Sequence, residues 1–221
     1  MRVLILGATG MIGQGVLREC LSAPDVDSVL VAGRTPLGQT HPKLTEVLRP
    51  DLLQWTDVEP QLAGIDACFY CLGVSSAGLS EPDYRRVTVD FAVALATSLE
   101  RASPNATFCF ISGASTDGAG TGKTMWARVK GQAENALRAL GFKRLFLFRP
   151  AYIQPMDGIV SKTGSYRVMY AVMAPLYPLW KRLMPNQVTS TRQLGRAMLQ
   201  VTRNGFAKEI LESADINVAA Q

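Results

Sequence analysis

Three glycines near the start of the chain, Gly7, Gly10 and Gly13, have the spacing of a phosphate-binding turn. They follow an apolar run at residues 3–6 and precede an amphipathic segment, so a strand is expected to turn into a helix here. In such a turn the glycines permit a tight bend, the approach of a diphosphate and close packing of helix on strand. Free N–H groups at the start of the helix bind phosphate oxygens. The pattern predicts a dinucleotide site formed by Gly7, Thr9, Gly10, Met11, Ile12 and Gly13.

A second apolar run, residues 28–32, ends in Gly33-Arg34-Thr35. In a strand–helix–strand dinucleotide site this position meets the adenine ribose, and a carboxylate here binds the 2′-hydroxyl group of NAD. The chain has Arg34 instead, and a guanidinium group is suited to a 2′-phosphate. We therefore predict NADP as the cofactor. The alternative is that Arg34 is an ordinary surface arginine.

A second group of residues that could take part in a reaction consists of Ser112, Trp126 and Lys130. Ser112 follows the apolar run at residues 107–111, while Trp126 and Lys130 are four positions apart in a helical pattern and therefore share a face. With the motif GATGMIG, these residues make the chain resemble the atypical and extended short-chain dehydrogenase/reductase family, including its sugar-nucleotide epimerase-like members. The resemblance continues to Arg149-Pro150.

The resemblance implies a role for each of these residues. Ser112 matches the serine that polarises a carbonyl group, and Lys130 matches the lysine that holds the nicotinamide ribose and lowers the pKa of a catalytic tyrosine. Trp126 occupies the position of that tyrosine, and an indole N–H is not a general acid near neutral pH. A catalytic proton must then come from another source, for which the sequence offers Tyr84, Tyr152, Tyr166, Ser115, Asp117, Lys123 or water.

Structural roles remain open for the same positions. Ser112 is also suited to cap the end of a strand, and Lys130 to pair with Glu134 one helical turn later. The resemblance further implies that Asp51 and Leu52 hold the adenine ring, and that the residues beside the ribose and diphosphate are Leu72, Gly73 and Val74. Asp51 also suits a turn, and Gly73 a strand end.

The elements expected to position these residues alternate between strands and helices. Apolar, strand-like runs lie at residues 3–6, 28–32, 45–48, 65–72, 107–111, 144–148 and 209–211. Helical patterns cover residues 80–101 and 124–140 and begin again at 190. Strands that are apolar throughout are covered on both faces. We predict an α/β protein with a doubly wound parallel sheet, a three-layer Rossmann fold, as one domain over residues 1–221 whose substrate or lid region lies at about 150–190.

Cysteine and histidine content argues against metal or triad chemistry. Cys68 and Cys71 have CxxC spacing, but on the expected strand they point to opposite faces. No second pair accompanies them, and His41 is the single histidine of the chain. We therefore expect core cysteines, no metal site, and no Ser-His-Asp hydrolase.

Composition indicates one sizeable core, since 48% of the 221 residues are hydrophobic. Between residues 123 and 208 there are 15 Lys and Arg residues but only two acidic ones. Such a segment attracts an anionic cofactor, an acidic substrate or an anionic lipid surface, while its dispersed basic residues do not resemble a nucleic-acid recognition module. We expect no secretory signal and no transmembrane segment, and hence a cytoplasmic protein.

Residues 165–185 are rich in aromatic residues and methionine: Tyr166, Tyr170, Met173, Tyr177 and Trp180. The segment is expected to be a lid over a small-molecule substrate, a surface for a partner or membrane, or part of the core. Two functions follow for the chain: an NADP-dependent oxidoreductase that acts on a small carbonyl or hydroxyl substrate without the usual tyrosine, or a catalytically silent NADP-binding regulator or assembly factor. The fold alone does not choose between them.

Overall fold

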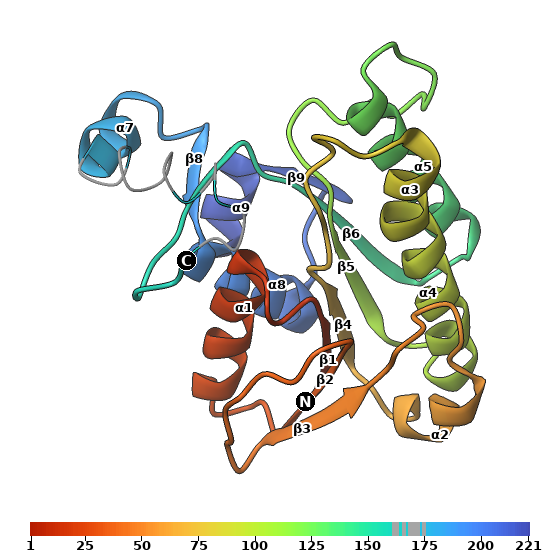
Figure 1. The fold of residues 1–221 in the computed structure, drawn as a ribbon. Helices are drawn as coiled ribbons and strands as arrows, with labels where there is room; N and C mark the ends of the chain where they lie inside the picture. Colours follow the sequence, from red (N-terminus) through yellow and green to blue (C-terminus); the bar gives the residue numbers. More distant parts are fainter. Residues whose placement is uncertain (161–163, 165–166, 168–172, 174–175) are drawn as a thin grey trace.

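A seven-stranded parallel sheet forms the centre of the molecule (Figure 1). The structure is a computed structural model that describes residues 1–160, 164, 167, 173 and 176–221. Seven strands pair in the order β3-β2-β1-β4-β5-β6-β9, all parallel. They are β1 (Arg2–Leu6), β2 (Ser28–Gly33), β3 (Leu44–Leu48), β4 (Ala67–Tyr70), β5 (Thr107–Ile111), β6 (Arg144–Arg149) and β9 (Ile210–Glu212).

Helices cover both faces of this sheet, which gives the predicted three-layer α/β/α Rossmann arrangement (Figure 1). One face carries α1 (Met11–Ser22), α8 (Thr191–Asn204) and α9 (Ser213–Ala219). The other carries α2 (Glu59–Leu62), α3 (Glu81–Arg85), α4 (Phe91–Ala102) and α5 (Met125–Ala139). A short 3₁₀ turn, η1 (Thr56–Val58), precedes α2, and a π-helical turn, η2 (Arg86–Asp90), joins α3 to α4.

The two hydrophobic cores lie on opposite sides of the strands. In β1, Val3 and Ile5 belong to the core under α1 and α8, whereas Leu4 and Leu6 belong to the core under α4 and α5. This alternation follows from the two-residue period of a strand. Cys71 packs in the first core and Cys68 in the second, so the CxxC pair is divided between two sides of the sheet.

The strand order reverses between β1 and β4, and ligands in doubly wound sheets bind at such a point. A second, two-stranded parallel sheet joins β7 (Tyr152–Gln154) to β8 (Val188–Ser190). In the chain, β7 follows β6 and β8 precedes α8, and α7 (Tyr177–Leu183) lies between β7 and β8.

The boundaries of one helix and one strand differ from the sequence prediction. The helix expected over residues 80–101 is interrupted by the π-helical turn η2, and the strand expected over 65–72 is reduced to β4. The expected helix start at residue 190 is confirmed, because the Ser190 hydroxyl accepts a hydrogen bond from the Gln193 N–H. The single-domain boundary, with a substrate region at about 150–190, stays a prediction.

No helix in the described ranges is both long and apolar enough to cross a membrane. In the same ranges, His, Cys, Asp and Glu side chains form no group of three that could hold a metal ion. Tyr166 and Tyr170 of the aromatic segment lie outside the described residues.

Candidate functional site

The loop between β1 and α1 has a shape that requires glycine at two positions. Gly7 has a φ of 79°, and a Cβ atom there would lie 2.6 Å from the Leu72 nitrogen. A Cβ atom on Gly13 would lie 2.1 Å from the Gly7 oxygen, so only glycine lets α1 pack this closely on the loop. The Gly10 N–H donates to the same oxygen at 2.9 Å and closes the turn.

The start of α1 is open toward an anion. Its N-cap residue, Gly10, offers no capping side chain, and the first turn contains no acidic residue. The free N–H groups of that turn therefore keep their affinity for a negatively charged group. Met11 and Ile12 line a cavity at this point, so the loop fits the diphosphate of a dinucleotide.

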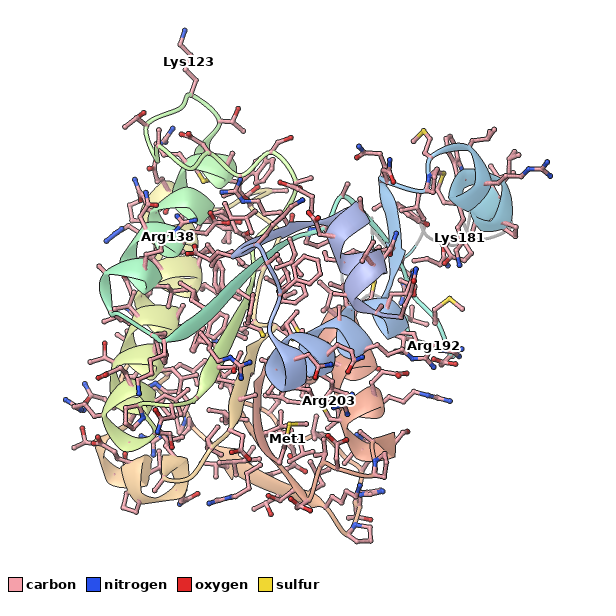
Figure 2. The ribbon with its side chains drawn as sticks, turned by 180° about the vertical axis from the view of Figure 1, so that it is seen from behind. Met1, Lys123, Arg138, Lys181, Arg192 and Arg203 are labelled. Atoms are coloured by element: carbon pink, nitrogen blue, oxygen red, sulfur yellow. The ribbon has the colours of Figure 1, made fainter. Side chains whose placement is uncertain are left out.

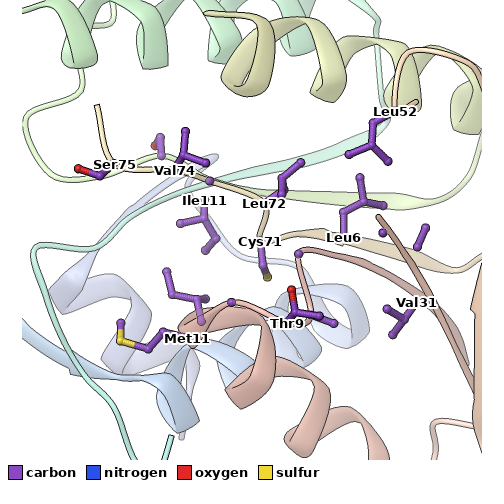
Figure 3. Close-up of a pocket in the computed structure, with 18 of the residues that line it drawn as sticks. Leu6, Thr9, Met11, Val31, Leu52, Cys71, Leu72, Val74, Ser75 and Ile111 are labelled. Carbon is purple, nitrogen blue, oxygen red and sulfur yellow. The ribbon is translucent and has the colours of Figure 1, made fainter. Parts of the chain in front are cut away.

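This cavity has a volume of about 890 Å³, within the range of small-molecule sites, and lies at the carboxyl ends of the strands. Figure 3 shows Thr9 and Met11 on one side, Leu72 and Val74 opposite, and Cys71 and Ile111 between them. Predicted cofactor residues in the lining are Gly7, Thr9, Gly10, Met11, Ile12, Arg34, Leu52, Leu72, Gly73, Val74 and Lys130.

Arg34 lies in the lining just after β2, and its side chain is exposed. Among the described residues it forms no ion pair with a carboxylate. The described lining contains two cationic side chains, Arg34 and Lys130, and no acidic one. The cavity therefore favours an anionic ligand.

Ser112 and Lys130 line the same cavity from β5 and α5. The Lys130 Nζ donates to the Ile111 carbonyl oxygen at 3.0 Å and lies 5.5 Å from the centre of the Phe110 ring. Burial lowers the pKa of Lys130 to about 8, although the negative charge of Glu134 opposes this shift. The neutral amine form of Lys130 is therefore more populated near neutral pH than that of an ordinary lysine.

A buried carboxylate holds Ser112 in place. The Ser112 hydroxyl donates to Glu134 Oε1 at 2.6 Å, and the Arg149 Nε donates to the same oxygen at 2.9 Å. Glu134 is fully buried, and its ion-pair partner is Arg149 rather than Lys130, the partner that helix spacing offered. Sequence reasoning missed this network, although Ser112 and Arg149 both lie at the carboxyl ends of neighbouring strands, where their side chains can meet.

Three predicted site residues, Gly13, Asp51 and Trp126, lie outside the cavity lining. Gly13 packs beneath the loop, and the Asp51 carboxylate accepts a hydrogen bond from the Leu53 N–H at 3.0 Å. The Trp126 ring packs against the core beneath α4 and α5, beside Gly113. The structure thus places the indole outside the cavity lining.

Of the proton sources considered from sequence, the described ones lie outside the cavity lining: Tyr84, Tyr152, Ser115, Asp117 and Lys123. Tyr152 donates its hydroxyl hydrogen to Gln154 Oε1 at 2.8 Å, and the Asp117 carboxylate accepts loop N–H groups from Ala119, Thr121 and Gly122. Tyr166 lies outside the described residues. The lining instead offers the ammonium group of Lys130, the thiol of Cys71 and the hydroxyl groups of Thr9, Thr35, Ser75 and Ser112.

Related proteins agree with this picture of a nucleotide-binding fold. The solved UDP-glucuronic acid 4-epimerase from Bacillus cereus, in complex with NAD, has a TM-score of 0.69 and 16% identity, over 96% of this chain and 78% of that one. The dTDP-glucose 4,6-dehydratase DesIV from Streptomyces venezuelae, with NAD and TYD bound, has a TM-score of 0.70 and 18% identity, over 96% and 75%. At this identity the likeness shows the fold.

Curated relatives are more similar in sequence but are not named as enzymes. Protein FMP52, mitochondrial, from Chaetomium globosum is 28% identical over 157 residues, which cover 68% of this chain and 65% of that protein. Protein HTATIP2 from Rattus norvegicus is 28% identical over 153 residues, covering 68% and 62%. The chain thus spans just under two thirds of the length of these relatives.

Two conclusions follow from the comparisons. The expectation of a cytoplasmic location is wrong, because the FMP52 relatives from Chaetomium globosum and Emericella nidulans are named mitochondrial. The family model described as "NAD dependent epimerase/dehydratase family" matches residues 3–133, more than half of the chain, and includes the glycine loop, Ser112 and Lys130. The chain belongs to the NAD dependent epimerase/dehydratase family.

Proposed function

We propose that the chain binds NADP(H) in the cavity and acts as an oxidoreductase on a small carbonyl or hydroxyl substrate. One observation carries this proposal: the glycine loop after β1, which is suited to a diphosphate, lines the same cavity as Ser112 and Lys130. A dinucleotide that spans these strands has its diphosphate at α1, and NADP supplies or accepts the hydride.

The preference for NADP rests on Arg34 and on the absence of acidic side chains from the described lining. A guanidinium–phosphate contact contributes about 1.5–3 kcal/mol. Replacing Arg34 with alanine should therefore weaken NADPH binding by roughly 10- to 100-fold and change NADH binding by less than about twofold. Titration calorimetry with both coenzymes measures this difference, with Lys123→Ala as an exposed control. Equal losses for NADPH and NADH would contradict the assignment of Arg34 to a 2′-phosphate.

Two side chains of the cavity are suited to a substrate hydroxyl group. Because the Ser112 hydrogen is donated to Glu134, Ser112 Oγ is left with lone pairs that accept a hydrogen bond from a substrate hydroxyl. The Lys130 Nζ, whose pKa is about 8, holds or releases a proton near neutral pH. In this proposal Lys130 takes over the proton transfer for which Trp126 is chemically unsuited.

A catalytically silent NADP-binding regulator is the second candidate, favoured by the position of Trp126 outside the cavity lining. Turnover distinguishes the two functions. NADPH consumption with a panel of carbonyl compounds, and NADP⁺ reduction with the matching alcohols, is compared for the native chain, Lys130→Ala and the control Lys123→Ala. Turnover that is lost only in Lys130→Ala supports the oxidoreductase. Tight NADPH binding without turnover on either panel favours the regulator.

A further inference from the structure

Helix α7 exposes an unusual amount of apolar surface. It contains no buried residue, and four large apolar side chains in and beside it are 43–66% exposed: Leu176, Leu179, Leu183 and Met184. Leu176, Leu179 and Leu183 are three and four positions apart and therefore share one helix face. Apolar side chains gathered in this way mark a contact surface rather than scattered surface leucines.

The stretch of sequence that contains α7 is rich in positive charge. Residues 158–208 contain eight Lys and Arg residues and no Asp or Glu. In this stretch Arg192, Arg196 and Arg203 are neutralised by acids from elsewhere in the chain. Lys181 and Arg182 form no ion pair with any described carboxylate, and Figure 2 labels Lys181 beside α7. The leucine face is thus accompanied by unneutralised cations.

We propose that α7 docks on an anionic lipid surface, with Leu176, Leu179 and Leu183 inserted among the acyl chains and Lys181 and Arg182 beside the phosphate groups. Buried apolar area and attraction to anionic headgroups are the two contributions that hold an amphipathic helix at a membrane surface.

A second copy of the chain suits this surface less well. The helix has 7 residues, a length of about 10 Å, which is short for an interface that buries roughly 800 Å² per partner. A symmetric contact would also bring Lys181 and Arg182 of the two copies together, and like charges repel.

The test is co-sedimentation of the full chain with vesicles of phosphatidylcholine alone or mixed with phosphatidylserine. We expect binding to the mixed vesicles, weak binding to the neutral ones, and release by salt. The double variant Lys181→Ser, Arg182→Ser should bind on the order of 30-fold more weakly, at about fivefold per basic residue near an anionic surface. The double variant Leu179→Ser, Leu183→Ser should lose at least about tenfold.

Matched controls lie far from α7. Leu48→Ser removes a leucine that is 53% exposed on β3, and Lys123→Ser removes an exposed lysine at the opposite end of the molecule (Figure 2). Both should bind vesicles like the native chain, and NADPH binding should be unchanged in all four variants. Absence of native binding to the mixed vesicles would overturn the proposal. So would equal losses in the controls, or a dimer in lipid-free solution that the leucine variant dissociates.

Discussion

At the scale of single side chains, two ionisable groups lie beside the cavity, Glu134 and Lys130. Glu134 is a fully buried carboxylate beside the cavity, and Lys130 is a lysine whose pKa lies more than two units below the ordinary 10.5. Both lie on α5, one helical turn apart. The lowered pKa of Lys130 couples the protonation of this residue to the stability of the fold.

Lys130 makes the stability of the fold depend on pH. Its pKa falls from 10.5 in the unfolded chain to about 8 in the folded one, so between these values the unfolded state binds more protons and stability rises with pH. Below about pH 8, Lys130 is charged in both states, and the full cost of burying this charge lowers the free energy of unfolding. Lys130→Met should therefore be more stable than the native chain at pH 7, by a margin that shrinks toward pH 10.5. Urea unfolding of both proteins at several pH values measures the margin, which would stay constant if Lys130 had an ordinary pKa.

Glu134 should matter to stability because its removal leaves Arg149 charged and poorly paired. Breaking a buried ion pair from one side costs about 3–5 kcal/mol, so Glu134→Gln should lower the free energy of unfolding by this amount. The matched control is Glu209→Gln, which removes the 44%-exposed partner of Arg138 and should cost less than about 1 kcal/mol. Urea unfolding compares the two variants, and similar small losses in both would show that the buried pair does not hold the site.

At the level of secondary structure, the turn between β1 and α1 leaves no space for a side chain at Gly7 or Gly13. Gly13→Ala would bring a Cβ atom within 2.1 Å of the Gly7 oxygen, so the helix must shift away from the loop. We expect a loss of unfolding free energy on the order of 1–3 kcal/mol, together with weakened NADPH binding. Gly118→Ala is the control, since its Cβ atom would lie 3.7 Å from its nearest neighbour. Thermal unfolding and calorimetry would count against this reading of the loop if Gly13→Ala behaved like the control.

The same turn shows why part of the molecule is predictable from sequence. Gly7 and Gly13 have steric roles that local spacing reveals, and near-continuous apolar runs reveal the parallel strands and the Rossmann fold. The Ser112–Glu134–Arg149 network was not predictable, because its hydrogen-bonded partners are 22 and 15 positions apart and meet only when β5, β6 and α5 pack. The short strands β7 and β8 were missed because each has 3 residues and pairs across the chain.

For the molecule as a whole, the distribution of charge favours an anionic ligand in the cavity. The formal net charge is +5, and the described lining of the cavity carries Arg34 and Lys130 without an acidic residue. The N-terminal end of α1 adds its partial positive charge at the diphosphate position. These charges would attract the anionic dinucleotide that we propose as the ligand.

Titration calorimetry of the native chain with NADPH, NADP⁺, NADH and NAD⁺ tests this account most directly. We expect one binding site per chain, with tighter binding of the two phosphorylated coenzymes than of their counterparts. Thermal unfolding in the same buffer establishes that the chain is folded. A folded chain that releases no heat with any of the four coenzymes would contradict the dinucleotide site itself.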